Sequence, residues 1–171
     1  EAIHQLESEQ LIDYEPNIGA IVKGINDSVY METLQVLALL EGYATALSAP
    51  AIDEEGIERL KEINARMNNH LQNYELDKIA DVNKEFHYCI YDYCPNELLI
   101  NTIKEMWERL DLVRHSGFHF FPQRTPYSIK EHEKMIELIQ QNADSVEIEQ
   151  FARNHKLNTL EAFKERNKKE K

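Results

Sequence analysis

The sequence has few residues that interrupt helices and few cysteines. Its 171 residues include five glycines, five prolines and two cysteines. The glycines and prolines separate long stretches with helical periodicity, and this pattern is typical of an all-α protein. Cys89 and Cys94 lie five residues apart. Two cysteines are too few for a disulfide framework, so we expect a reducing compartment, the cytoplasm.

Long apolar runs and an excess of basic residues are also missing. No run approaches the roughly 18 to 20 apolar residues of a membrane span, and no signal-peptide pattern opens the sequence. The 19 Lys and Arg residues are outnumbered by 31 Asp and Glu residues, which gives a net charge of −12. Such a surface repels a phosphate backbone, so we expect the chain as given to bind DNA poorly.

Apolar residues spaced three or four apart predict a bundle of helices. Four helices are expected near residues 28–48, 53–71, 77–93 and 96–116. Two more are expected at the capping boxes formed by Ser128 with Glu131 and by Asp144 with Glu147, after an aromatic-rich loop at 117–126.

The first 24 residues have a different pattern. Residues 11–14 and 20–23 flank the sequence Glu15-Pro16-Asn17-Ile18-Gly19, which indicates a β-hairpin turn. We therefore predict an all-α fold, an antiparallel bundle of six or seven helices, preceded by a short β-hairpin.

Three histidines carry the main chemical signal. His87, His132 and His155 each lie on the apolar stripe of a separate predicted helix, and Asn83 lies one turn before the first of them. In an antiparallel bundle such positions can face one interior point. Three imidazoles that converge in one bundle would build a metal site, which points to sensing or catalysis.

Evidence for catalysis is weak. A di-metal bundle needs paired Glu-x-x-His motifs, and none occurs in the sequence. His132-Glu133 is not a zincin motif because position 136 is Ile. The chain also lacks a glycine-rich phosphate loop and a nucleophile with a recognisable partner, so we do not expect an enzyme.

Several sequence blocks resemble the FCD effector domain of the FadR-like branch of the GntR family of bacterial transcription regulators. The blocks are LEGYATALSA, NKEFHYCIYDYCPNELL, EHEKMIELI and ARNHKLNTL, and their order and spacing match the family. The segment AIHQLESEQLIDYEPNIGAIVKGI resembles the end of a winged helix-turn-helix, comprising the end of the recognition helix and the wing. The resemblance implies two domains, with residues 1–25 as the remnant of the DNA-binding domain and 26–171 as the ligand-binding and dimerisation domain.

The resemblance also implies a function. In FCD domains a metal holds a small organic-acid effector, and effector binding changes the affinity of the homodimer for its operator DNA. We expect the metal in this chain to be zinc or nickel. We expect the effector to close the bundle around the metal and to shift it against the wing through residues 24–28. The metal ligands implied here are His87, His132, His155 and Asn83.

Two positions depart from the family pattern. The family usually has Asp where this chain has Asn83, and Asp81 is a poor substitute because it lies roughly 240° around the helix from His87. The family often has an arginine that grips the effector carboxylate where this chain has Leu37. We therefore name Arg109, Arg114 and His115 as candidate effector-binding residues. Two alternatives remain open: a metal-free dimerisation scaffold of the same kind of regulator, or an all-α metalloenzyme.

Overall fold

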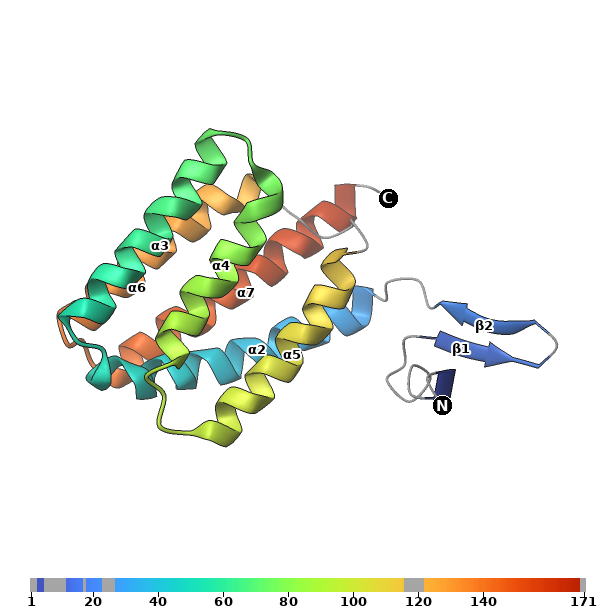
Figure 1. Cartoon of the computed structure of the whole chain (residues 1–171), viewed down its shortest axis with the longest axis horizontal. Coiled ribbons are helices and arrows are strands. Elements are labelled where there is room, and N and C mark those ends of the chain that lie inside the picture. The colour runs from blue at the N-terminus through green and yellow to red at the C-terminus, as the bar shows by residue number, and fades with distance from the viewer. Residues whose placement is uncertain (1–2, 5–11, 17, 23–26, 116–121, 170–171) are drawn as a thin grey trace.

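The computed structural model describes residues 3–4, 12–16, 18–22, 27–115 and 122–169. Six long helices form the bundle, and a two-stranded antiparallel hairpin precedes them (Figure 1), as predicted. The strands are β1 (Ile12–Glu15) and β2 (Gly19–Val22). The helices are α2 (Asp27–Ser48), α3 (Glu54–Gln72), α4 (Leu76–Tyr91), α5 (Glu97–His115), α6 (Thr125–Gln140) and α7 (Ser145–Lys169), with short 3₁₀ turns at Ala49–Ala51 and Pro122–Arg124.

The hairpin confirms the predicted turn. Ile12 pairs with Val22, and the amide of Ile18 donates to the carbonyl of Glu15 at 3.1 Å. Gly19 follows the turn with a φ of +104°, a conformation that side chains with a Cβ rarely adopt. The predicted end of the recognition helix falls largely outside the described residues.

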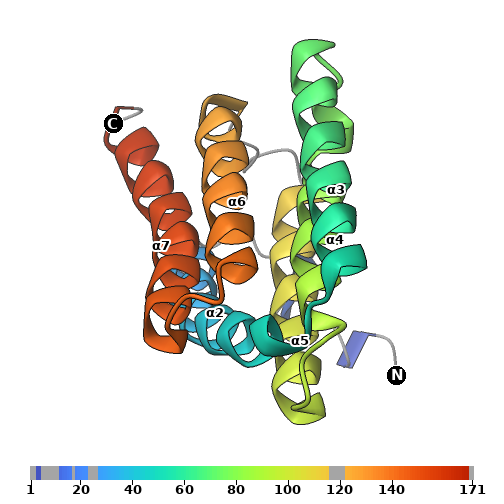
Figure 2. The same cartoon turned by 90° about the vertical axis from the view of Figure 1, so that its left-hand side faces the viewer.

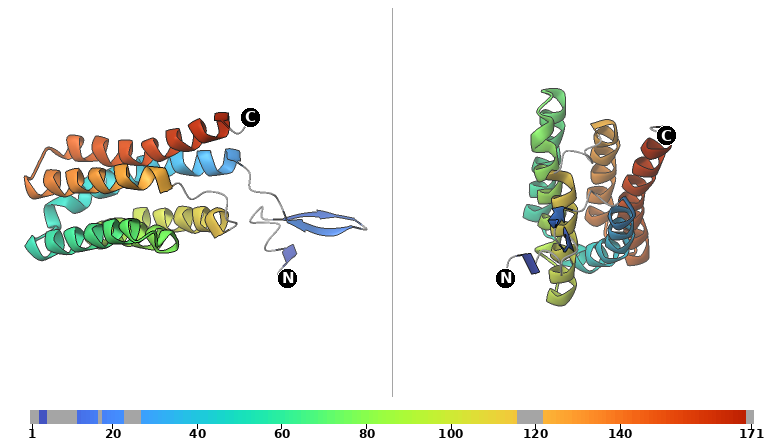
Figure 3. Two further views of the ribbon diagram at one scale, coloured as in Figure 1. Left: turned by 90° about the horizontal axis from the view of Figure 1, so that it is seen from above. Right: turned by 90° about the vertical axis from the view of Figure 1, so that its right-hand side faces the viewer.

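The helices lie in two layers. In Figures 2 and 3, α6 and α7 form one layer with most of α2, and α3, α4 and α5 form the other. The helices α2 and α7 run side by side in opposite directions, since Asn167 near the end of α7 donates to Asp27 at the start of α2 at 2.9 Å. Gly42 allows this close approach, because a Cβ on it would lie 2.8 Å from the backbone oxygen of Glu149. None of the described helices has a stretch long and apolar enough to cross a membrane.

Helix starts follow the sequence signals with one exception. The carboxylate of Asp53 caps α3 by accepting from the amide of Gly56 at 2.9 Å, and Asp144 accepts from the amide of Val146 at the start of α7. The predicted start of α6 at Ser128 is wrong: the helix begins at Thr125, and Ser128 is buried inside it. Pro126 explains the earlier start, because proline is favoured in the first turn of a helix.

Part of the predicted 117–126 loop is also structured, since Pro122–Arg124 is a 3₁₀ turn and α6 follows it directly. Residues 116–121, with the three predicted loop phenylalanines, lie outside the described part, and so does most of the linking segment 24–28.

Candidate metal centre

Three different helices bring the three predicted histidines together in the bundle interior. His87 comes from α4, His132 from α6 and His155 from α7, and their exposed fractions are 2%, 0% and 4%. One ring nitrogen from each lies within 4.8 Å of the other two. The Nε2 atoms of His87 and His155 are 3.3 Å apart. These histidines lie 45 and 23 residues apart in sequence. Their predicted convergence is therefore confirmed.

The ring of His155 is oriented by a carboxylate behind it. Its Nδ1 lies 2.6 Å from Oε2 of Glu131, and since a carboxylate only accepts, Nδ1 of the neutral ring is the donor. Glu131 is itself held by Arg124 and by the amide of Asn158, which donates to Oε1 at 2.9 Å. The lone pair of His155 is thereby left on Nε2, which faces the other two rings.

The ring of His132 is oriented by an amide. Asn64 on α3 donates from Nδ2 to the carbonyl of Ile129 at 3.0 Å, so its Oδ1 is free to accept from Nδ1 of His132 at 3.1 Å. Phe86 stacks on this ring with 3.8 Å between centroids. Nε2 of His132 is buried and, within the described part of the chain, has no hydrogen-bond partner.

Burial keeps two of these rings neutral. It lowers the pKa of His132 well below its ordinary 6.5, and the charge that His155 carries when protonated, with the charges of Lys156 and Arg124, lowers it further. Burial also lowers the pKa of His155, although the hydrogen bond to Glu131 opposes this effect. For Glu131, burial raises the pKa, but the hydrogen bonds and charges of His155 and Arg124 outweigh it, so the net pKa lies below the ordinary value.

The arrangement fits a divalent transition metal. Metal binding requires neutral imidazoles, and two nitrogens 3.3 Å apart can both lie about 2.1 Å from one ion. The buried Nε2 of His132 has no partner among the described residues, and a ligand bond would satisfy it. The hydrogen bonds that Nδ1 of His155 and of His132 donate to Glu131 and Asn64 are the support that metal-ligating histidines usually have.

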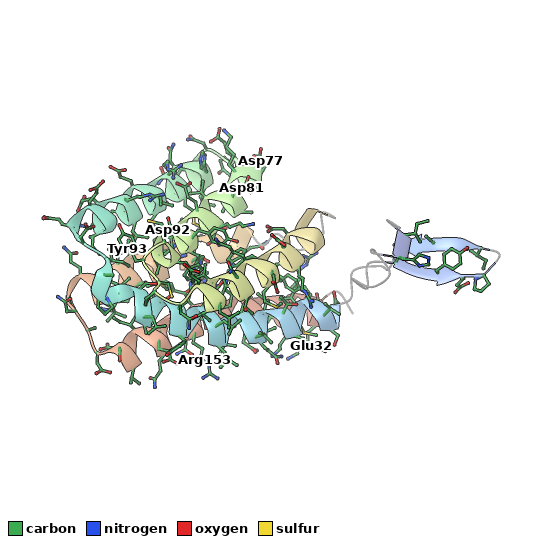
Figure 4. The ribbon with its side chains drawn as sticks, turned by 60° about the horizontal axis from the view of Figure 1, so that its bottom comes forward. Glu32, Asp77, Asp81, Asp92, Tyr93 and Arg153 are labelled. Atoms are coloured by element: carbon green, nitrogen blue, oxygen red, sulfur yellow. The ribbon has the colours of Figure 1, made fainter. Side chains whose placement is uncertain are left out.

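Asn83 lies on α4 one turn before His87 and is half-buried. Its role as an oxygen ligand stays a prediction. Asp81 is exposed, and Figure 4 shows it at the outer edge of the bundle on α4. In this structure it lies away from the interior, as its helical position predicted.

The predicted effector-binding residues lie on α5. Arg109 is exposed, so the structure does not bring it into the buried cluster. The side chains of Arg114 and His115 lie outside the described part of the chain.

A second buried polar cluster adjoins the histidines. Lys156 of α7 lies 2.9 Å from Oε2 of Glu41 on α2, and the two side chains are only 4% and 2% exposed. Trp107 donates from Nε1 to Oε1 of Glu41 at 2.7 Å, and the Lys156 ammonium lies 4.2 Å from the centroid of its ring. The Trp107 ring is 5.8 Å from that of His87. Burial raises the pKa of Tyr91 well above its ordinary value, and the charge of Glu41 adds to the effect.

Sequence reasoning missed the supporting residues Asn64, Arg124, Glu131 and Lys156 as parts of the site. Two of them had a signal in the sequence. Asn64 interrupts the apolar stripe of α3, and Lys156 interrupts the stripe of α7 between Ala152 and Leu160. A polar residue on an apolar stripe must have a buried partner. Arg124 and Glu131 had no such signal, because their role depends on the turn before α6.

Comparisons with known proteins agree with this architecture. The sequence model described as FCD domain matches residues 32–158. No curated protein matches the sequence. The structure is similar to that of "E. coli McbR/YncC", with a TM-score of 0.78 and 16% identity over 97% of this chain and 78% of that one. It also resembles "Streptococcus agalactiae GntR", with a TM-score of 0.67 and 14% identity over 94% of this chain and 79% of that one.

A third similar structure is also that of an FCD domain. It is that of the metal-free FCD domain of TM0439, with a TM-score of 0.63 and 22% identity over 82% of this chain and 95% of that one. At these identities the likeness concerns the fold alone.

Proposed function

The chain belongs to the FCD family, and from that premise we propose that it is the effector-sensing part of a ligand-responsive transcription regulator of the FadR-like GntR branch. Residues 26–171 would bind the effector and dimerise, and residues 1–25 would be the end of a winged helix-turn-helix with the hairpin as its wing. The observation that carries the proposal is the buried convergence of three histidine nitrogens within 4.8 Å of one another.

The proposed site holds one divalent ion, zinc or nickel, on His87, His132 and His155, with Asn83 as an oxygen ligand. The ion supplies a Lewis-acidic centre that a carboxylate can bind. The protein contributes neutral, preoriented imidazoles and a buried environment. A small organic acid is the proposed effector, and Arg109, Arg114 and His115 stay predictions as residues that contact it.

The proposed regulator acts as a cytoplasmic homodimer that binds operator DNA through the full-length protein. Exposed apolar side chains along one face of α2 support a dimer, because such a stripe is typical of an interaction surface. These residues are Val29, Val36, Leu39 and Tyr43, with exposed fractions between 38% and 51%. Effector binding is proposed to shift the bundle against the wing through residues 24–28 and thereby change operator affinity.

The first experiment is elemental analysis of the purified chain before and after dialysis against a chelator. We expect about one transition-metal ion per chain, and loss of the ion should lower the melting temperature, because a ligand that binds only the folded state stabilises it. His132→Ala should remove the ion. His70→Ala is the matched control, since His70 lies at the end of α3 and pairs with Glu75 instead.

A chain that takes up no ion even after reconstitution would refute the metal-dependent sensor. The homodimeric scaffold without metal would then be the better explanation, and sedimentation analysis would test it. Turnover of an organic acid by the metal-loaded chain would instead favour a metalloenzyme.

A further inference from the structure

The histidine cluster is closed off from solvent, and the described side chains that enclose it differ in how firmly they are held. The three rings are at most 4% exposed, so an ion or a small reagent reaches them only when neighbouring side chains move aside. Toward α2, α3, α6 and α7 the enclosing side chains are at most 21% exposed and hydrogen-bonded or ion-paired in the interior. They are Asn64, the pair Arg124–Glu131 and the pair Glu41–Lys156.

The seam between α4 and α5 is closed in another way. Lys84 of α4 pairs with Asp111 of α5, and the two side chains are 28% and 27% exposed (Figure 1). The Lys84 ammonium lies 5.4 Å from the ring centre of Tyr88 and 6.0 Å from that of Trp107. The two rings meet edge to face with 6.2 Å between centroids. An ion pair that water reaches therefore covers a single aromatic contact.

This seam leads to His87. Its ring lies 5.8 Å from that of Trp107, and Lys84 lies three residues before it, on the same side of α4. Trp107 is fully buried and is fixed through its Nε1 to Glu41. Tyr88 is only half-buried. The ion pair and the Tyr88 ring are therefore the parts of the seam that can move while the core stays packed.

Separation of an ion pair in contact with water has a small free-energy cost, because water solvates both charges. Separation of a buried pair such as Glu41–Lys156 leaves charges without solvent and is far less favourable. Among the described contacts around the cluster, the Lys84–Asp111 pair should therefore open most often.

We propose that the seam between α4 and α5 is the entrance to the histidine cluster, and that the Lys84–Asp111 ion pair with the Tyr88 ring is its gate. The passage of a metal ion through this gate rests on the proposed metal site. The access of small molecules to His87 does not depend on a metal, so the entrance can be tested without one.

The first test measures how fast zinc alone enters and leaves the chain. A gate is a barrier shared by entry and exit, so weakening it raises both rate constants by the same factor and leaves the Kd unchanged. Asp111→Asn keeps the shape of the side chain and removes its charge, and we expect both rates to rise about three- to fivefold. Entry is followed by stopped-flow fluorescence of Trp107, and release is followed in chelator at concentrations where the rate no longer depends on it.

The second test needs no metal. Diethyl pyrocarbonate acylates neutral imidazoles, and peptide mass spectrometry of the chelator-treated chain gives the rate at each histidine. In Asp111→Asn the rate at His87 should rise about three- to fivefold. The rate at His70 should stay the same, because His70 lies at the end of α3, is 19% exposed and pairs with Glu75.

Matched variants separate the gate from a general loosening of the bundle. Glu85→Gln removes the same charge next to Lys84 and breaks the pair of Glu85 with Arg66, which joins α4 to α3, so its rates should equal those of the unaltered chain. Lys84→Met should accelerate exchange as Asp111→Asn does. The double variant should be no faster than the faster single one, since both changes break one contact. The melting temperature of each variant is measured beside its rates.

The outcomes distinguish the gate from the metal sensor. Unchanged rates at His87 in both Asp111→Asn and Lys84→Met overturn the gate, and so does an equal acceleration in Glu85→Gln. A zinc Kd that changes because only one of the two rates changes also overturns it, since the pair would then act on the bound ion. A chain that binds no zinc overturns the metal sensor, and the acylation rate of His87 then decides about the gate alone.

Discussion

Replacing Lys156 by methionine should destabilise the fold strongly. The change keeps most of the aliphatic stem but removes the ammonium, so the carboxylate of Glu41 is left buried at 2% exposure without its counterion. Removing one partner of a buried ion pair typically costs about 3–5 kcal/mol. For a chain of this size, each kcal/mol corresponds to about 2–4 °C in melting temperature, so the expected drop is about 6–20 °C.

The assay is urea unfolding of the chelator-treated chain, followed by the fluorescence of its single tryptophan. That residue, Trp107, is fully buried and bonds Glu41, so its emission reports on this part of the core. Lys61→Met is the matched control. Lys61 pairs with Glu58 but both side chains are exposed, so the expected loss is below about 1 kcal/mol.

The double variant Glu41→Gln/Lys156→Met tests the cause of the loss. It removes both charges and keeps an amide oxygen that can accept from Trp107, so most of the lost stability should return. The reasoning would be refuted by a loss below about 1 kcal/mol in Lys156→Met, or by a double variant as unstable as the single one.

Two further predictions concern other parts of the bundle. Gly42→Ala should destabilise the chain by about 1–3 kcal/mol in urea unfolding, because the new Cβ would lie 2.8 Å from the oxygen of Glu149 and force α2 away from α7; an unchanged midpoint would contradict this. In the metal-free chain, stability should fall as the pH drops below about 6.5, since burial lowers the folded-state pKa of His132 and His155 and the unfolded chain takes up their protons first. These two groups should change the free energy of unfolding by at most about 2.7 kcal/mol per pH unit. A free energy of unfolding that stays constant between pH 7 and 5 would argue against neutral rings.

The fold could be predicted well from the sequence, and so could the identity of the three histidines in the buried cluster. The apolar periodicity of α2, α3 and α4 determined their limits to within about two residues. The apolar stripes predicted that the three histidines are buried, and the family resemblance added the prediction that they meet at one point.

The supporting contacts could not be predicted in the same way. Asn64 and His132 are 68 residues apart, and their hydrogen bond depends on how α3 packs against α6. The predicted start of α6 was wrong by three residues. The Ser128 capping pattern competed with Pro126, and the proline determined the first turn. Glu131 was therefore expected in the first turn of α6. It lies further inside the helix and accepts a hydrogen bond from His155.

The distribution of the histidines over the bundle has a consequence for signalling in the proposed sensor. The ion would tie together α4, α6 and α7, whereas the hairpin is followed directly by α2, which contributes no imidazole. Glu41 on α2 holds Lys156, the residue next to His155, and it also accepts from Trp107 on α5. A movement of His155 at the proposed ion would therefore also displace the adjacent Lys156. Through its ion pair with Glu41, Lys156 would transmit this movement to α2, the helix that follows the hairpin. In the proposed regulator, the ion pair of Glu41 and Lys156 would then couple the sensor to the helix that follows the proposed wing.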